Sequence, residues 1–130
     1  MTADFEYKCI QGEKLPLAPI KLTHLGRTIL TEALIDSGSA LSIVHGEIGE
    51  QLGLVHRGEL VKISGAGGKE TVLHMYELDN ELAGRNFKSK FGLPMKRGDV
   101  PYSILGRDGI FENFEVKFRQ RESKFALSDY

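Results

Sequence analysis

The stretch that decides the fold reads Glu32-Ala33-Leu34-Ile35-Asp36-Ser37-Gly38-Ser39-Ala40. Its apolar part, 33–35, predicts a buried strand that runs directly into an aspartate. A carboxylate at the end of a buried strand costs free energy unless it is hydrogen-bonded. Ser37 offers a hydroxyl, and Gly38 permits a tight turn whose backbone N–H groups can point at the carboxylate. The pattern predicts an aspartate held rigidly at the end of a strand, although Asp-Ser-Gly is also an ordinary turn sequence.

Short strands are predicted on both sides of this stretch. Residues 60–78 alternate around the glycine-rich turn Ser64-Gly65-Ala66-Gly67-Gly68-Lys69, which predicts a hairpin. Residues 102–105 form an apolar run that enters Gly106-Arg107-Asp108-Gly109, a weak echo of the first strand and its turn. Short helices are expected over 47–52 and 110–113, and two prolines exclude 15–19 from a central strand. Many short strands with little helix predict an all-β, closed or folded-over structure.

Length and composition limit the protein further. A chain of 130 residues predicts a single domain, 1–130, with its own core. The net charge is −1 with acids and bases mixed along the chain, so charge indicates no nucleic-acid partner. The amino terminus lacks an apolar stretch, so neither a signal peptide nor a membrane span is expected.

The metal-binding and nucleophilic residue types give weaker signals. Cys9 is the one cysteine, so no intrachain disulfide can form, and a reducing compartment, the cytoplasm, is the simpler inference. Because Cys9 falls in an alternating segment, we expect a buried structural thiol rather than a nucleophile. The four histidines have no ligand spacing, which argues against a metal site: His24, His45, His56 and His74.

Three motifs together resemble the retropepsin-type aspartic proteases, the single-domain class found in retroviruses and in related cellular forms. Residues 33–38 match that family's apolar-apolar-Asp-Thr/Ser-Gly motif, 64–68 match its glycine-rich flap, and 104–108 match its apolar-apolar-Gly-Arg-Asn/Asp motif. The resemblance covers residues 20–113. It implies the acid protease fold, a closed β-barrel with one or two short helices.

The resemblance also implies a mechanism without a cofactor or metal. Aspartic proteases hold a water between two carboxylates that share one proton, but this chain carries a single Asp-Ser-Gly and is too short for two lobes. The second carboxylate must come from another copy, which predicts a homodimer with Asp36 of each chain at a twofold axis. Ser37 and Gly38 would support Asp36, with the hydroxyl of Ser37 bonding across the dimer to the opposite loop.

The flap would bind the substrate. A hairpin tip made of Gly65, Ala66, Gly67 and Gly68 has large backbone freedom and can fold over an extended peptide or protein substrate. An ordinary hairpin turn is the simpler reading of the same residues. A phosphate-binding loop is excluded, because the spacing is wrong and no helix follows.

The chain departs from the family in two places. The retroviral enzymes commonly carry Ala-Asp after the Asp-Thr/Ser-Gly motif, where this chain has Ser39-Ala40, so the partner of Arg107 is left open. Residues 114–127 predict a hairpin rather than a single interface strand, so the dimer contact is expected to differ. Two hypotheses follow: an active aspartic endopeptidase, or a weak or inactive retropepsin-like dimerisation or peptide-binding module. The intact Asp36 favours the first and Ala40 the second.

Overall fold

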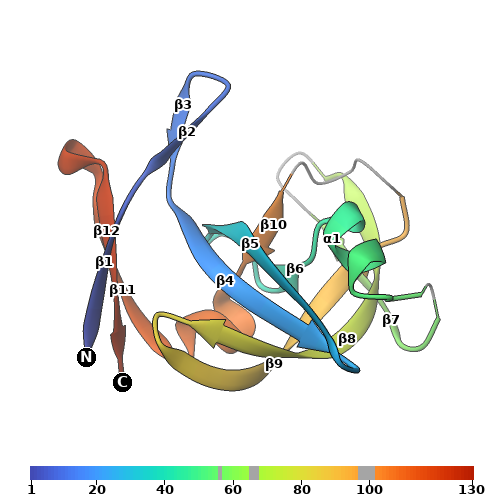
Figure 1. The fold of residues 1–130 in the computed structure, drawn as a ribbon. Helices are drawn as coiled ribbons and strands as arrows, with labels where there is room; N and C mark the ends of the chain where they lie inside the picture. Colours follow the sequence, from blue (N-terminus) through green and yellow to red (C-terminus); the bar gives the residue numbers. More distant parts are fainter. Residues whose placement is uncertain (56, 65–67, 97–101) are drawn as a thin grey trace.

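A closed β-barrel forms the centre of the molecule (Figure 1). The computed structural model describes residues 1–55, 57–64, 68–96 and 102–130. Six strands follow one another around the barrel: β4 (Leu17–His24), β5 (Arg27–Ile35), β10 (Ser103–Leu105), β6 (Ser42–Ile43), β9 (Arg85–Pro94) and β8 (Glu70–Leu82). The barrel closes because β8 pairs with β4, and β7 (Leu60–Ser64) extends β8 on its other side. The predicted all-β closed barrel is confirmed.

Alternation of side chains builds the barrel core. In β4 and β5, Ala18 lies opposite Ala33, and both are fully buried. The next inward residues of β4, Ile20 and Leu22, are buried as well, whereas Lys21 between them faces outward and pairs with Glu81 of β8 at 2.9 Å. The strands therefore have one apolar and one polar face, as expected for a half-buried sheet.

The strand β10 brings the two glycine turns together. It lies between β5 and β6, parallel to β5 with Leu105 opposite Ile35, and antiparallel to β6. The two apolar strands that echo each other in the sequence are thus direct neighbours. Because parallel neighbours end at the same edge of a sheet, the turns that follow Ile35 and Leu105 meet at that edge.

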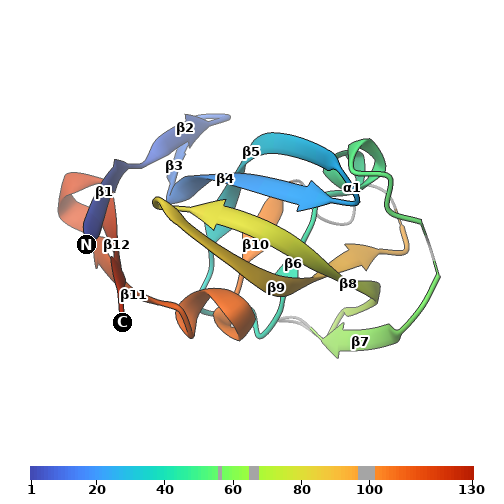
Figure 2. The same cartoon turned by 60° about the horizontal axis from the view of Figure 1, so that its bottom comes forward.

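A second, three-stranded sheet joins the two ends of the chain, and we call it the terminal sheet (Figure 2). Its order is β1 (Thr2–Glu6), β12 (Lys124–Asp129) and β11 (Phe114–Arg119), all antiparallel. Phe5 stacks on Phe125 with ring centroids 5.1 Å apart, and Phe125 and Leu127 are buried. The predicted hairpin over 114–127 is present and is extended by the first strand of the chain.

The remaining strand pair is a two-stranded arm that stands away from the barrel (Figure 1). It consists of β2 (Lys8–Ile10) and β3 (Glu13–Leu15), with the Gln11–Gly12 turn at its tip. The prediction of a buried thiol is wrong, because Cys9 lies on this arm and is exposed. Alternation correctly indicated a strand here but not whether another layer covers it.

The helices are short. α1 (Gly46–Gln51) begins after His45, whose Nδ1 accepts a hydrogen bond from the N–H of Glu47. η1 (Arg107–Phe111) overlaps the helix expected over 110–113 and is kinked, with non-helical angles at Asp108 and Gly109. A 3-10 turn, η2 (Gln120–Glu122), connects β11 to β12. No helix in the described ranges has the length and apolar character needed to cross a bilayer.

The proline-containing start of β4 corrects one expectation. The two prolines exclude 15–19 from a central strand, yet Pro19 lies in β4 opposite Glu32 of β5. Proline is tolerated there because the pairing of β4 with β8 begins only at Ile20. At Pro19 the strand needs hydrogen bonds on one side alone.

Candidate active site

Asp36 is held where β5 ends. Its backbone N–H donates to the carbonyl of Leu105 at 3.0 Å, so the neighbouring strand β10 fixes the position of the Asp36 backbone. The side chain is half-buried. Strand pairing therefore places this carboxylate at the barrel edge without help from flexible side chains.

The turn after Asp36 provides the hydrogen bond that the sequence predicted. The N–H of Gly38 donates to Oδ1 of Asp36 at 2.9 Å, and the N–H of Ser39 donates to the Asp36 carbonyl at 3.2 Å. A Cβ at Gly38 would lie 3.1 Å from that same Oδ1. Glycine thus lets the backbone approach the carboxylate closely enough to orient it.

Ser37 contributes its carbonyl rather than its hydroxyl within the chain. The side chain is exposed, and its hydroxyl makes no hydrogen bond to any of the described residues. The Ser37 carbonyl accepts a hydrogen bond from Nη1 of Arg107 at 2.7 Å. This answers the question that Ala40 left open: Arg107 binds the backbone of residues 36–38, which we call the Asp36 turn. No sequence pattern could have indicated a backbone acceptor.

Residues 39–42 pack tightly against the second glycine turn. The N–H groups of Arg107 and Asp108 donate to the carbonyls of Ser39 and Ala40, both at 2.9 Å. A Cβ at Gly106 would lie 2.3 Å from the carbonyl oxygen of Leu41, closer than any real contact. Only glycine fits there, so the glycine of the Gly-Arg motif is explained by the close approach of two backbones.

Two buried serines, which the sequence analysis did not single out, complete this network. The hydroxyl of Ser42 accepts a hydrogen bond from the N–H of Gly106 at 3.0 Å, and that of Ser103 accepts one from the N–H of His45 at 2.9 Å. Both side chains are almost fully buried. They satisfy backbone donors where short strands leave gaps in the ladder.

Two carboxylic acids lie at η1, Asp108 within it and Glu112 directly after it. The hydrogen bond with the carboxylate of Glu112 raises the pKa of Asp108, with desolvation and repulsion from Glu112 adding and Lys90 opposing. The N–H of Gly109 donates to Oε1 of Glu112 at 2.7 Å and lowers the pKa of Glu112. This pair is exposed and bound to its own helix, so it does not supply a second carboxylate for Asp36.

The predicted flap coincides with the connection between β7 and β8. The two strands are antiparallel, and Ser64 lies opposite Glu70, which confirms the hairpin. Gly68 is exposed with φ of +78°, a conformation that favours glycine. Gly65, Ala66 and Gly67 lie outside the described residues, so their role in binding substrate remains a prediction.

Comparisons with known proteins bear on the fold. No model of a protein family matches the chain, and no curated protein matches it. Among solved structures, the protease of EIAV in complex with the inhibitor HBY-793 is similar, with 22% sequence identity and a TM-score of 0.59. The match covers 81% of this chain and 93% of the viral chain. The chain has a retropepsin-like fold.

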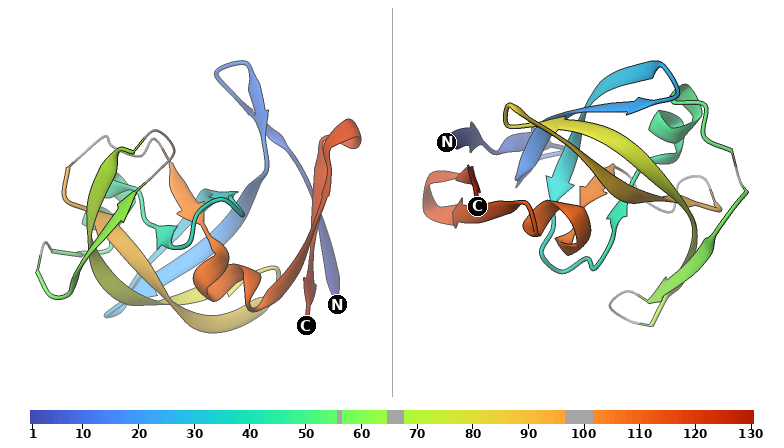
Figure 3. Two further views of the ribbon diagram at one scale, coloured as in Figure 1. Left: turned by 180° about the vertical axis from the view of Figure 1, so that it is seen from behind. Right: turned by 90° about the horizontal axis from the view of Figure 1, so that it is seen from below.

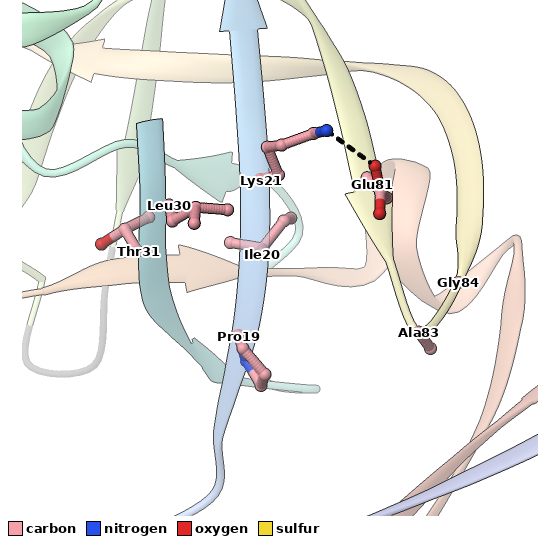
Figure 4. A pocket seen from close by; sticks show the side chains of 8 residues that line it. All are labelled: Pro19, Ile20, Lys21, Leu30, Thr31, Glu81, Ala83 and Gly84. Carbon is pink, nitrogen blue, oxygen red and sulfur yellow. Dashed lines mark ion pairs between the residues drawn. The ribbon is translucent and has the colours of Figure 1, made fainter. Parts of the chain in front are cut away.

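A cavity elsewhere on the retropepsin-like barrel is a weaker candidate site. It has a volume of about 260 Å³ and lies between β4, β5 and the β8–β9 turn (Figure 4). The ion pair of Lys21 and Glu81 borders it, and Leu30, Ala83 and Gly84 form other parts of its wall. Its lining includes neither Asp36 nor Gly68.

No metal site competes with Asp36 in the part of the chain that the structure describes. No group of three or more histidine, cysteine, aspartate or glutamate side chains is placed to hold an ion there. His56 lies outside the described residues. The candidate site is therefore the Asp36 turn, residues 36–38, whose backbone Arg107 binds.

Proposed function

We propose that this protein is an aspartic endopeptidase that acts as a homodimer. The observation that carries the proposal is the hydrogen-bonded position of Asp36 at the end of β5 in a retropepsin-like fold. The chain has one Asp-Ser-Gly, so an aspartate pair requires a second copy. A cytoplasmic location belongs to the same proposal and is supported by the single cysteine.

The chemistry follows from two like carboxylates that share one proton. The ionised Asp36 takes a proton from a water as that water attacks the carbonyl carbon of the peptide bond. The protonated Asp36 of the second copy gives its proton to the developing oxyanion. Because two like charges this close repel, the reacting pair shares one proton, as in the aspartic proteases generally.

The residues around Asp36 and the β7–β8 hairpin would support this reaction. The N–H of Gly38 orients one carboxylate oxygen, and Arg107 fixes the carbonyl of Ser37, so the turn needs little reorganisation during catalysis. The β7–β8 hairpin would cover an extended peptide and add strand-like hydrogen bonds to it. The substrate class is therefore peptide or protein in extended conformation.

One observation favours the second candidate, a dimerisation or peptide-binding module without useful turnover. Ala40 stands where the retroviral enzymes commonly have an aspartate, and Arg107 has the Ser37 carbonyl as its partner. The anchoring of the substrate backbone that the aspartate provides is then absent. A module of this kind would bind peptides and leave them intact.

The test is cleavage of a diverse peptide pool between mildly acidic and neutral pH, with wild type and Asp36→Asn compared at several protein concentrations. The proposal expects cleavage by wild type alone, with specific activity rising with concentration. Equal cleavage by both proteins would contradict the role of Asp36. Peptide binding without cleavage by a folded wild-type dimer would favour the binding module.

A further inference from the structure

The strand β11 leaves one edge of the terminal sheet open. It pairs with β12 from Phe114 to Arg119, and none of the described residues pairs with its other side. An open edge presents unpaired N–H and C=O groups that can bind another strand. The opposite edge of the sheet is β1.

The sequence of β11 is complementary to itself. It reads Phe114-Glu115-Val116-Lys117-Phe118, so opposite charges flank a central valine and aromatic residues flank the charges. The two charged side chains are exposed on one face of the strand. The aromatic residues and Val116 lie on the other face, where Phe118 is 42% exposed although Phe114 is buried.

Among the registers that keep the two faces matched and are centred on residues 115 to 117, only the one centred on Val116 sets no like charges opposite each other, although the register centred on Lys117 would pair Glu115 with Arg119. In antiparallel pairs, residues directly opposite each other point to the same face. If Val116 lies opposite Val116 of a second copy, each Glu115 faces a Lys117 and each Phe114 faces a Phe118. A shift by two residues in either direction sets Glu115 against Glu115 or Lys117 against Lys117, which repel.

We propose that two copies of this chain join edge to edge through β11, with Val116 on the twofold axis and a six-stranded sheet continuous across both terminal sheets. The inference rests on the proposed function, because that function needs a second copy to complete the Asp36 site. The other edge is a poor alternative. β1 carries two acids, Asp4 and Glu6, and no base, so two β1 strands would repel.

The Asp36 turn and β11 are connected by a short path. η1 lies between the barrel and the terminal sheet (Figure 3) and contacts β6, β9 and β11. It begins at Arg107, whose guanidinium donates to the Ser37 carbonyl, and β11 starts three residues after it ends. The strand that would bind the second copy therefore follows directly after the segment that holds the turn carrying Asp36.

The experiment exchanges the charges at the proposed contact. Glu115→Lys and Lys117→Glu are made singly and together, and the dimer dissociation constant is measured by sedimentation at low salt, where surface charges are least screened. Lys88→Glu is the matched control, because Lys88 is an exposed β9 lysine that pairs with Asp79 away from the terminal sheet. Thermal unfolding of each variant checks that it folds.

We expect each single variant to weaken the dimer by roughly tenfold or more, because two attractive cross-strand pairs become repulsive. The double variant and an equimolar mixture of the two single variants should both regain wild-type affinity. In the mixture, two lysines of one chain face two glutamates of the other. Lys88→Glu should dimerise as the wild type does.

The outcomes separate this inference from the proposed function. A dimer that responds to the charge exchange but cleaves no peptide would support the β11 contact and contradict the protease. An active dimer that ignores the single variants, or single variants that the mixture fails to rescue, would overturn the β11 contact alone. A wild-type chain that stays monomeric at every concentration would overturn both.

Discussion

Arg107 shows how a single residue can set the geometry of the Asp36 turn. Its guanidinium donates to the Ser37 carbonyl at 2.7 Å while its own N–H donates to the Ser39 carbonyl. The two bonds hold the turn from both sides of Gly38. Because the acceptor is a backbone carbonyl, this hydrogen bond does not depend on the side chain at position 37. It does require a side chain at position 107 that is long enough to reach that carbonyl.

We expect Arg107→Ala to lower kcat more than it changes KM. Loss of the bond to Ser37 frees the turn and costs about 1 kcal/mol of stability at this exposed position. Steady-state kinetics and urea unfolding measure the two effects. Arg121→Ala, an exposed arginine on η2, is the control and should change neither. A change in KM alone would mean that Arg107 binds substrate rather than positioning Asp36.

Gly106 is a second single residue on which the site depends. Gly106→Ala should destabilise the protein by at least about 3 kcal/mol, because the new methyl group would overlap backbone atoms of Ser39 and Leu41 that cannot move aside. Gly12→Ala at the tip of the arm meets no atom within 4 Å and should cost about 1 kcal/mol through its positive φ alone. Chemical unfolding compares them, and equal losses would contradict the crowding at Gly106.

At the scale of elements, the terminal sheet is stabilised by its aromatic layer. Phe125 is 1% exposed and stacks on Phe5, so Phe125→Ala removes a buried ring and leaves a cavity against Phe5. We expect a loss of about 3–5 kcal/mol in the free energy of unfolding. Thermal unfolding followed by circular dichroism measures it. A loss below 1 kcal/mol would show that the sheet is not packed as described.

The η1 turn carries a pH-dependent pair. The hydrogen bond between Asp108 and Glu112 raises the pKa of Asp108. The Asp108 carboxyl therefore holds its proton more tightly in the folded chain than in the unfolded chain. Asp108 therefore makes stability fall as pH rises from its unfolded pKa through its folded pKa. Glu112, with its lowered pKa, acts oppositely and contributes stability that is lost as pH falls through its folded pKa.

Glu112→Gln should return the pKa of Asp108 toward its ordinary range, because the main cause of the shift and its charge repulsion both disappear. NMR titration of the side-chain carboxyl carbons follows Asp108 directly. An unchanged Asp108 in the variant would mean that burial, rather than Glu112, raises its pKa.

The sequence predicted local features well and long-range ones poorly. The Asp36 turn and the β7–β8 hairpin depend on neighbouring residues, so glycine spacing and alternation were enough. The acceptor of Arg107, the pairing of β1 with β12 and the exposure of Cys9 depend on segments far apart in the chain. Periodicity gives the faces of a strand but not the layer that covers them.

At the scale of the whole molecule, the proposed site exists once per dimer, and this gives a test with mixed chains. When Asp36→Asn protein is added to an equal amount of wild type and the chains exchange, about one quarter of the dimers should keep both aspartates. Peptide cleavage per total protein should fall to that fraction of the wild-type value, whereas a mixture with Lys88→Glu protein instead should keep the wild-type value. A loss in simple proportion to the wild-type chains would mean that each chain works alone.

The arm gives the protein a chemical handle as well as a weakness. Cys9 is the one thiol in the chain, and it stands exposed on a two-stranded projection. Under air, two such thiols from different molecules can oxidise to a covalent link that has nothing to do with any native contact. Under reducing conditions, a maleimide probe or spin label would attach at a single place per chain. A pair of labelled copies would then report one distance between their arms.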